Sequence, residues 1–238
     1  MKSDLAKVLH RVNGQPMICI LLNTLNKIGF ERTIVVIGHQ GEEVKKALSN
    51  FDVEYVWQKE QHGTGHAVMM ARPTLSDFEG TTLVALGDVP FLSKETIEKL
   101  LETHEKSQAA ATCLSAEFSD PTGYGRIVRR GESKVLERIV EHKDASPALL
   151  KIKEINSGTF CFNNQELFNW LKEIKSNNEP GEYYLTDVVK LMHDNGLIVR
   201  VVKTSNHSEV LGINSLEQLK ELEKRIANKS KQNNYDTI

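Results

Sequence analysis

The run TTLVALGDVPFLSKETIEKLLETH, from Thr81 to His104, decides the fold class because it holds one complete strand-to-helix unit. Thr82 to Leu86 is a short β-branched and apolar run, typical of a buried strand. Ser93 is a good N-cap for a helix from Lys94 to His104. Asp88 follows the strand directly, where the loops of an open parallel sheet leave a crevice for ligands.

Strand-like and helix-like segments alternate on either side of this unit. The β-branched run Thr33 to Ile37 is typical of a strand covered on both faces. The alternation predicts an α/β fold with a doubly wound, mixed but mostly parallel sheet flanked by helices. Other expected helices are Pro16 to Ile28, Gln40 to Leu48 and one beginning after Gly65; other expected strands are Val53 to Trp57 and Ala110 to Ser115.

The alternation changes at Asp120. Two turn signals interrupt strand-like runs in DPTGYGRIVRRGESKVLERIVE, which predicts a small antiparallel excursion. We expect one domain over residues 1–214, then a linker-like helix and a polar tail over residues 215–238. The remaining predicted elements are strands at Ile155 to Phe162, Leu197 to Thr204 and Val210 to Ile213, and helices at Gln165 to Ile174, Tyr183 to Asn195 and Ser215 to Ala227.

The composition excludes several classes of partner. The formal net charge is −2, which leaves no electrostatic footprint for nucleic acid or an anionic membrane. The N-terminus lacks the apolar run of a signal peptide, and no apolar stretch approaches the roughly 20 residues of a membrane span. Three widely spaced cysteines in apolar surroundings favour reduced thiols, so we expect a cytoplasmic protein.

A second glycine turn, GTGHA from Gly63 to Ala67, precedes the predicted helix after Gly65. Its backbone N–H groups and the helix N-terminus suit an anion or a base edge. It is not a dinucleotide GxGxxG motif, because residue 68 is valine, and the sequence holds no Walker motif. Together with this turn, Asp88 is better interpreted as a Mg²⁺ ligand than as a simple turn cap.

Other polar residues allow two interpretations each. His62 and His66 have the spacing of a helical zinc pair, which the intervening glycines disfavour. Gln58 ends a predicted strand and either presents its amide to a base edge or is a surface glutamine. The charged run Glu141 to Asp144 is either a binding site or a solvated loop. Asn156 either contacts a sugar or forms a turn. Asn214 is either a ligand-binding residue or the N-cap of the last helix.

Eight short runs stand along the chain in a fixed order: LAKVLH (5–10), QKEQHGTGHA (58–67), GDVP (87–90), DPTGYGRI (120–127), VEHKDA (140–145), EINSG (154–158), GEYYLTD (181–187) and LGIN (211–214). In this order they resemble the bacterial N-acetylglucosamine-1-phosphate uridylyltransferases, the pyrophosphorylase half of a bifunctional uridylyltransferase–acetyltransferase. The resemblance covers nearly the whole chain and implies a Rossmann-like nucleotide-diphospho-sugar transferase fold.

The resemblance implies that UTP and N-acetylglucosamine 1-phosphate react to UDP-N-acetylglucosamine and pyrophosphate, a step toward peptidoglycan, with Mg²⁺ as cofactor. It implies catalytic roles for Lys7 at the phosphates and Asp88 at the metal. It is also compatible with a homo-oligomer. By matched position, Mg²⁺ would be held by Asp88 and Asn214, the uracil edge would be read by Gln58, Gly63 and Thr64, and the sugar pocket would be lined by Gly125, Glu141, Asn156, Tyr184 and Thr186.

Two departures from the family pattern affect these expectations. The family opens with a strand and a glycine-rich LAAGxGTRM loop, and Met1 falls at the last residue of that loop. Ala6 also replaces the family's proline. We therefore expect the first strand, the loop and the C-terminal β-helix to be missing, with low pyrophosphorylase activity and a tendency to self-associate. The alternatives are a non-catalytic sugar-nucleotide binder or regulator, and a nucleotidyltransferase for another hexosamine phosphate.

Overall fold

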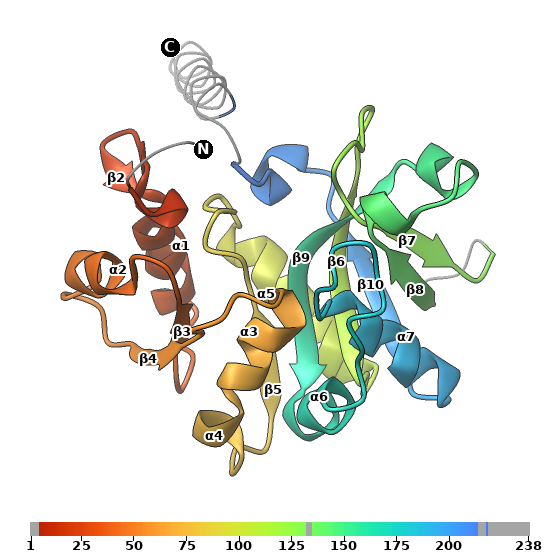
Figure 1. The fold of residues 1–238 in the computed structure, drawn as a ribbon, viewed down its shortest axis with the longest axis horizontal. Coiled ribbons are helices and arrows are strands. Elements are labelled where there is room, and N and C mark those ends of the chain that lie inside the picture. The colour runs from red at the N-terminus through yellow and green to blue at the C-terminus, as the bar shows by residue number, and fades with distance from the viewer. Residues whose placement is uncertain (1–4, 132–134, 214–217, 219–238) are drawn as a thin grey trace, which may run out of the picture.

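A six-stranded mixed sheet forms the larger part of the computed structural model, which describes residues 5–131, 135–213 and 218. Strand β9 pairs antiparallel with β5, β6 and β7, β7 pairs antiparallel with β8, and β6 pairs parallel with β10 (Figure 1). The α/β class, the mixed sheet and the antiparallel excursion are confirmed. The prediction of a mostly parallel sheet is wrong for the described ladders of this sheet, because β9 runs antiparallel to each of its three neighbours and only β6 and β10 pair in parallel. The strands are β5 (Thr81–Val84), β6 (Ala111–Glu117), β7 (Arg126–Arg129), β8 (Leu136–Val140), β9 (Glu154–Asn163) and β10 (Val199–Lys203).

A smaller sheet lies to one side of the larger one. Its strands β3 (Ile34–Ile37) and β4 (Glu54–Trp57) are parallel, and it packs with α1 (Met17–Asn26) and α2 (Gly41–Ala47). The hairpin strands β1 (Arg11–Val12) and β2 (Gln15–Pro16) precede α1. Within the described ranges no hydrogen-bond ladder joins β3 to β5, and a cavity of about 700 Å³ lies between them.

This cavity makes two predictions of burial wrong. All four residues of β5 are half-buried, although the sequence predicted a buried strand. In β3 only Val35 and Ile37 are buried, while Ile34 and Val36 are half-buried. The physical reason is the same in each case, because one side of each strand faces the cavity and not a neighbouring strand.

The helices begin and end close to the predicted residues. Helix α5 (Lys94–Lys106) begins where the Ser93 hydroxyl accepts a hydrogen bond from the Thr96 N–H at 3.2 Å, which confirms the predicted cap. Helix α7 (Thr186–Asp194) begins later than the predicted Tyr183. The other helices are α3 (Thr64–Met70), α4 (Arg72–Leu75) and α6 (Asn164–Leu171), with 3₁₀ turns η1 (Lys7–Leu9), η2 (His142–Asp144), η3 (Leu149–Lys151) and η4 (His207–Val210).

One predicted strand is wrong, and one predicted helix cannot be compared. Val210 ends a 3₁₀ turn, and residues 211–213 form no strand, because the Ile213 N–H bonds to the Asp88 carbonyl at 3.0 Å and not to a sheet. Apart from Gln218, the predicted helix Ser215 to Ala227, and with it the boundary at residue 214, lies outside the described residues.

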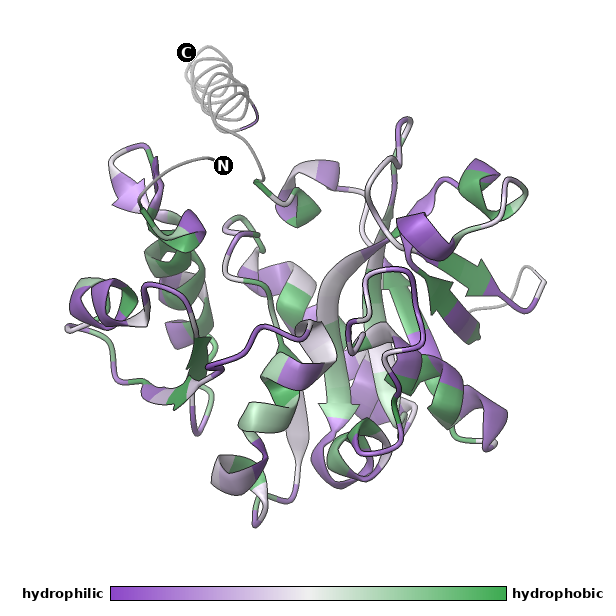
Figure 2. Ribbon diagram, viewed as in Figure 1, coloured by the Kyte–Doolittle hydropathy of each residue, from purple (hydrophilic) through white to green (hydrophobic). Residues whose placement is uncertain are grey.

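Hydrophobic residues concentrate on the strands and on the helix faces that cover them, with hydrophilic residues mainly on loops (Figure 2). Cys19, Cys113 and Cys161 are buried and unbridged. Burial raises the pKa of each thiol. In the described part of the chain, no helix is both long and apolar enough to cross a membrane.

Asn164 ties the α4–β5 connection to the end of β9. Its side chain is 2% exposed and donates to the carbonyls of Leu75 at 2.9 Å and Phe78 at 2.7 Å. Its Oδ1 accepts from the Thr82 hydroxyl at 2.8 Å. A single carboxamide thus satisfies three polar groups whose pairing would otherwise be lost in a buried region.

Asn164→Ala should therefore lower the free energy of unfolding by about 3 kcal/mol, because buried donors and acceptors lose their partners. Urea unfolding followed by circular dichroism measures the change. Asn195→Ala removes one bond from an exposed carboxamide to the Leu191 carbonyl and should cost less than about 1 kcal/mol. Equal losses in the two variants would contradict the structural role of Asn164.

Candidate functional site

Asp88 and Lys7 lie together at the carboxyl end of β5. The Lys7 ammonium contacts Oδ2 of Asp88, and the two side chains are 35% and 22% exposed. Gly87 permits this approach, since a Cβ there would lie 3.1 Å from Cγ1 of Val8 in η1. The sequence pattern placed Asp88 at a phosphate-and-metal crevice and the resemblance implied Lys7 at the phosphates, and the structure brings the two into one ion pair at a partly open position.

The hydroxyl of Tyr124, which the sequence reasoning did not single out, hydrogen-bonds to the backbone of Gly212 beside Asp88. Burial raises the pKa of this phenol, and the Asp88 carboxylate adds to the rise against the lowering effect of the Gly212 bond. Tyr124 lies within the TGYGR run that carried part of the resemblance, and that run was the available signal. Asn214 lies outside the described residues.

Gln58 holds the glycine turn in place. Its Nε2 donates to the Gly63 carbonyl at 3.1 Å and lies 3.0 Å from Nδ1 of His66. Gly63 has φ +102°, and a Cβ there would lie 2.6 Å from the Tyr183 carbonyl oxygen. Glycine is therefore required for both backbone conformation and space.

The glycine turn is also joined to the segment before α7. The Tyr183 N–H bonds to the His62 carbonyl, and the Gly65 N–H bonds to the Tyr183 carbonyl, each at 2.8 Å. The Leu185 N–H donates to the Thr64 hydroxyl at 3.1 Å. These bonds hold Tyr183 and Leu185 outside the helix, which explains why α7 begins at Thr186. They also give the Thr64 side chain a structural partner.

Glu141, Thr186 and Gly125 converge on one half-buried position. The Thr186 hydroxyl donates to Oε1 of Glu141 at 3.0 Å. A Cβ on Gly125 would lie 3.2 Å from a Glu141 carboxylate oxygen. Burial raises the pKa of Glu141, and Asp187 and Asp144 add to the rise against the bond from Thr186. Glu141 is therefore part of an enclosed polar position and not of a fully solvated loop.

Asn156 and Tyr184 border the same region. The Asn156 N–H donates to the Gly125 carbonyl at 2.9 Å. Asn156 lies within β9 and not in a turn between elements, and its Oδ1 accepts from the Gly158 N–H at 2.9 Å beside an irregularity in the β6–β9 ladder. Burial raises the pKa of Tyr184 to about 12, with the carboxylates of Asp144 and Glu141 contributing.

The zinc interpretation of His62 and His66 gains no support. Helix α3 begins at Thr64, so His62 precedes it, and the two imidazoles pack edge to face with centroids 5.1 Å apart. Nε2 of His62 contacts Oε2 of Glu60 at 2.9 Å. Across residues 5–131 and 135–213, no three His, Cys, Asp or Glu side chains gather as a metal cluster.

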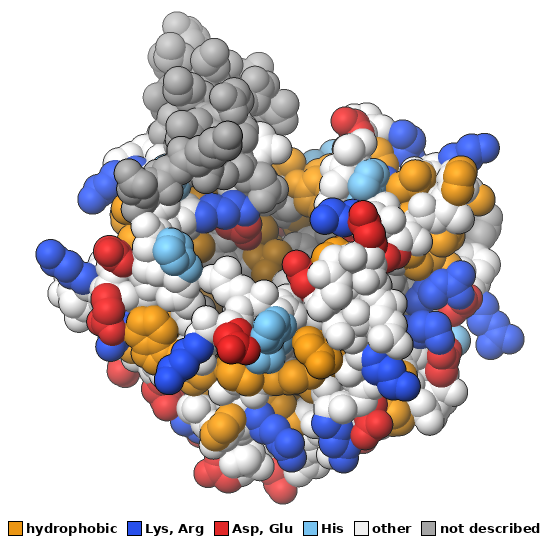
Figure 3. All heavy atoms as spheres, in the orientation of Figure 1, with side chains coloured by type: hydrophobic (Ala, Val, Ile, Leu, Met, Phe, Trp, Pro, Cys, Tyr) orange, Lys and Arg blue, Asp and Glu red, His pale blue; other side chains and the backbone are white. Residues whose placement is uncertain are grey.

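The face of the molecule drawn in Figure 3 has a hollow with hydrophobic walls, bordered by acidic and basic side chains.

Comparison with known proteins adds a family and a set of relatives. The model of the MobA-like NTP transferase domain matches residues 1–155. The chain is 47% identical over 223 residues to the bifunctional protein GlmU of Shouchella clausii, covering 94% of the chain and 49% of that protein. It is 46% identical over 233 residues to GlmU of Halalkalibacterium halodurans, covering 97% and 51%. The chain spans about half the length of the curated relatives it matches.

Solved structures show the same fold at low identity. UDP-glucose pyrophosphorylase complexed with UDP-glucose superposes with a TM-score of 0.73 at 19% identity, covering 94% of this chain and 90% of that chain. HddC from Yersinia pseudotuberculosis complexed with GMP-PN superposes with a TM-score of 0.68 at 16% identity, covering 95% and 92%. The predicted nucleotide-diphospho-sugar transferase fold is confirmed.

Gly63→Ala should lower the free energy of unfolding by about 3 kcal/mol, because the new methyl group adds a backbone clash to the cost of a left-handed conformation. Gly123→Ala is the matched control, since Gly123 has φ +84° with open space around its Cβ position. This control should lose only about 1 kcal/mol. Chemical unfolding measures the loss of unfolding free energy in both variants. Equal losses would show that the contact with Tyr183 does not matter for stability.

Glu141→Gln should stabilise the protein at neutral pH. The folded pKa of Glu141 lies above its unfolded value, so the folded state binds more protons and stability falls as the pH rises through that interval. The amide of glutamine stays neutral, so the variant does not lose stability as the pH rises. The stability gap to the parent should be largest at pH 7 and disappear below the ordinary pKa of a glutamate.

Thermal melting from pH 4 to pH 8 measures that gap. Glu173→Gln, at an exposed position, should change stability little across the same range. A gap that is absent at pH 7, or that widens in acid, would contradict the assignment.

Proposed function

We propose that this chain, which belongs to the family of MobA-like NTP transferase domains, is built to transfer a uridylyl group from UTP to N-acetylglucosamine 1-phosphate. The products are UDP-N-acetylglucosamine and pyrophosphate. The observation that carries the proposal is that the Lys7–Asp88 pair, the glycine turn fixed by Gln58 and the Glu141–Thr186 position are linked in one fold. The 47% identity to GlmU of Shouchella clausii over 94% of the chain supports the choice of substrates.

The base specificity follows from the Gln58 carboxamide. Its Nε2 is engaged by the Gly63 carbonyl and His66, which leaves Oε1 to accept a hydrogen bond. Uracil presents an N3–H donor at this edge, whereas cytosine presents an acceptor. Two facing acceptors leave a polar group unpaired, and such mismatches discriminate strongly between ligands. The site should therefore prefer UTP to CTP.

In the proposed reaction, a phosphate oxygen of the sugar phosphate attacks the α-phosphorus of UTP in line, and pyrophosphate leaves. The attacking oxygen is ionised at neutral pH, since the second pKa of a phosphate monoester is about 6, so no general base is required. Lys7 would hold a phosphate and offset its charge. Glu141, Thr186 and Gly125 would bind the sugar, with Asn156 and Tyr184 at the border of its pocket.

Asp88 fits a role as a Mg²⁺ ligand, because its partly exposed carboxylate already attracts the Lys7 cation. Mg²⁺ takes one or two protein carboxylates together with phosphate oxygens and water, and when bound it would neutralise charge on the phosphates. By resemblance, Asn214 would be the second protein ligand. Lys7 would release Asp88 and turn to the phosphate when the metal and nucleotide bind.

Isothermal titration with UDP-N-acetylglucosamine and Mg²⁺ tests the proposal on the chain as it exists. We expect saturable binding that Asp88→Asn weakens about tenfold or more, because a bound metal loses its carboxylate. Asp77→Asn, an exposed carboxylate in another region, should bind like the parent. Pyrophosphate release from UTP and N-acetylglucosamine 1-phosphate tests turnover. Replacing UTP with CTP tests the specificity for the base, and replacing N-acetylglucosamine 1-phosphate with glucose 1-phosphate tests the specificity for the sugar.

Each outcome of these assays has a defined meaning. Binding without turnover favours the non-catalytic sugar-nucleotide binder. Preference for another hexosamine phosphate would correct the sugar, and equal use of CTP would remove the assigned role of Gln58. An absence of nucleotide binding by a cooperatively folded chain would overturn the proposal.

A further inference from the structure

Arg126 is a buried cation whose guanidinium contacts two segments of the candidate site. The residue is 1% exposed, and it begins β7 directly after Gly125. Its Nη1 donates to the Tyr124 carbonyl, and its Nη2 lies 3.4 Å from Nδ1 of His142. Because a guanidinium can only donate hydrogen bonds, Nδ1 of His142 is the acceptor, and the imidazole is neutral with its proton on Nε2.

A buried guanidinium with these partners costs stability. Both partners of Arg126 are uncharged, and its Nε has no hydrogen-bond partner among the described residues. Burying a charge without a direct ion pair is unfavourable, and an apolar side chain of similar volume would be buried at lower cost. The guanidinium supplies what an apolar side chain cannot, because its rigid set of donors holds two segments at a fixed separation.

The two segments that Arg126 joins lie just beyond the end of a strand ladder. The last pair of the β7–β8 ladder is Arg126 with Val140, so the ladder itself does not hold Gly125 or Glu141. His142 directly follows Glu141 and begins η2. A Cβ on Gly125 would lie 3.2 Å from a Glu141 carboxylate oxygen. The guanidinium therefore supplies, at this close approach, the constraint that the ladder no longer gives.

Tyr124 extends the same connection toward Asp88. Its ring packs edge to face with Phe118, with centroids 5.1 Å apart. Its hydroxyl is hydrogen-bonded to the backbone of Gly212, and the next N–H, that of Ile213, donates to the Asp88 carbonyl at 3.0 Å. One tyrosine thus joins the guanidinium, through its carbonyl, to the segment beside Asp88, through its hydroxyl.

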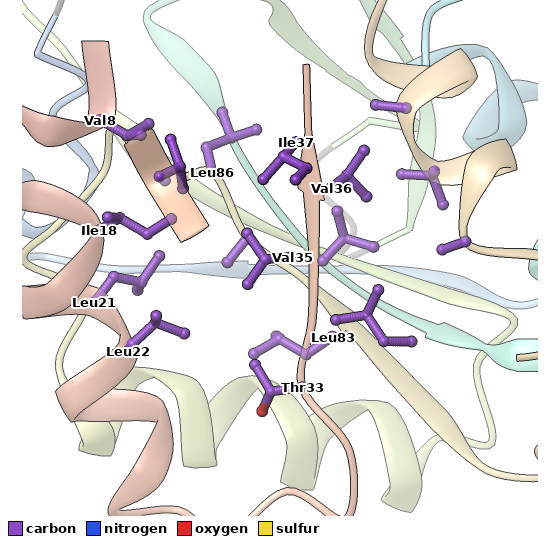
Figure 4. Close-up of a pocket in the computed structure, with 18 of the residues that line it drawn as sticks. Val8, Ile18, Leu21, Leu22, Thr33, Val35, Val36, Ile37, Leu83 and Leu86 are labelled. Atoms are coloured by element: carbon purple, nitrogen blue, oxygen red, sulfur yellow. The ribbon is translucent and has the colours of Figure 1, made fainter. Parts of the chain in front are cut away.

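Apolar contacts anchor the Asp88 end of this connection. Leu86 lines the cavity between β3 and β5 together with Val8 and Ile18 (Figure 4). A Cβ on Gly87 would lie 3.1 Å from Cγ1 of Val8 and 3.7 Å from Cδ1 of Ile18. The segment that leads to Asp88 is therefore packed against η1 and α1, and it gives the connection a fixed end.

We propose that Arg126 and Tyr124 form a bridge of positioning residues that fixes the sugar pocket at Glu141 relative to the phosphate and metal side at Asp88. This inference rests on the proposed function for the choice of ligand. A sugar nucleotide spans both sides and needs them at one separation, whereas a nucleoside diphosphate uses only the phosphate side. Loss of the bridge should therefore weaken the binding of a sugar nucleotide selectively.

Hydrogen exchange followed by mass spectrometry tests the bridge without any ligand. Arg126→Met should raise exchange rates at least about threefold both at residues 142–145 and at residues 212–213, because connected segments open together. Tyr124→Phe should raise exchange at the same two ranges, since it breaks the same connection at another point. Arg138→Met removes a partly exposed guanidinium from the neighbouring strand β8 and is the matched control, which should leave both ranges unchanged.

Isothermal titration in the presence of Mg²⁺ tests the selectivity of the bridge. Arg126→Met should weaken the binding of UDP-N-acetylglucosamine about tenfold or more and that of UDP less than about twofold. Arg126→Lys should recover part of the loss, because an ammonium group reaches one acceptor but lacks the planar set of donors. The combined loss in Arg126→Met with Tyr124→Phe should be smaller than the product of the single losses, since both break one connection.

Two results would overturn the proposal. The first is exchange that rises only beside the substituted residue in each variant, and the second is an equal loss of both ligands by variants that circular dichroism shows to be folded. If the folded parent binds neither ligand, the proposed function fails, and the exchange experiment alone decides whether the bridge exists. If Arg126→Met does not fold, Arg126→Lys and Tyr124→Phe provide the same comparisons with smaller changes.

Discussion

The backbone ladder of β9 is the interaction on which the rest of the molecule depends. This ten-residue strand pairs with β5, β6 and β7, and it thereby joins segments that are far apart in sequence. Its first half holds β7 and places Asn156 beside Gly125, whereas its second half fixes the position of β5, and the segment after β5 leads to Asp88. The Gly125 segment and the segment that leads to Asp88 are therefore held in one frame by peptide hydrogen bonds.

A second constraint connects the glycine turn around Gly63 to that frame. The backbone bonds among His62, Gly65 and Tyr183 bring the glycine turn against the segment before α7. The close approach depends on the missing side chain at Gly63, where any Cβ would meet the Tyr183 carbonyl. The glycine turn and the start of α7 thus depend on one local arrangement, although their residues come from opposite halves of the chain.

Local sequence signals predicted what local physics determines. The Ser93 cap and the start of α1 after Pro16 each depend on nearby residues, and each lies close to the expected position. The far ends of α1 and β5 come earlier than expected, at Asn26 and Val84. Tyr124 could not be found in this way, because its partner Gly212 is distant in sequence and lies in an irregular segment. The half-buried state of β5 was equally invisible, since an apolar run has the same pattern whether or not a neighbouring strand covers it.

The distribution of the three thiols makes the two sheets separately observable. Cys113 and Cys161 lie in β6 and β9 of the large sheet, whereas Cys19 lies in α1, which packs with the small one. A buried thiol reacts with an alkylating reagent only when its surroundings open. The labelling rate at Cys19 therefore reports opening of one unit, and the rates at Cys113 and Cys161 report opening of the other. The relative labelling rates of the native cysteines therefore show which of the two units opens first.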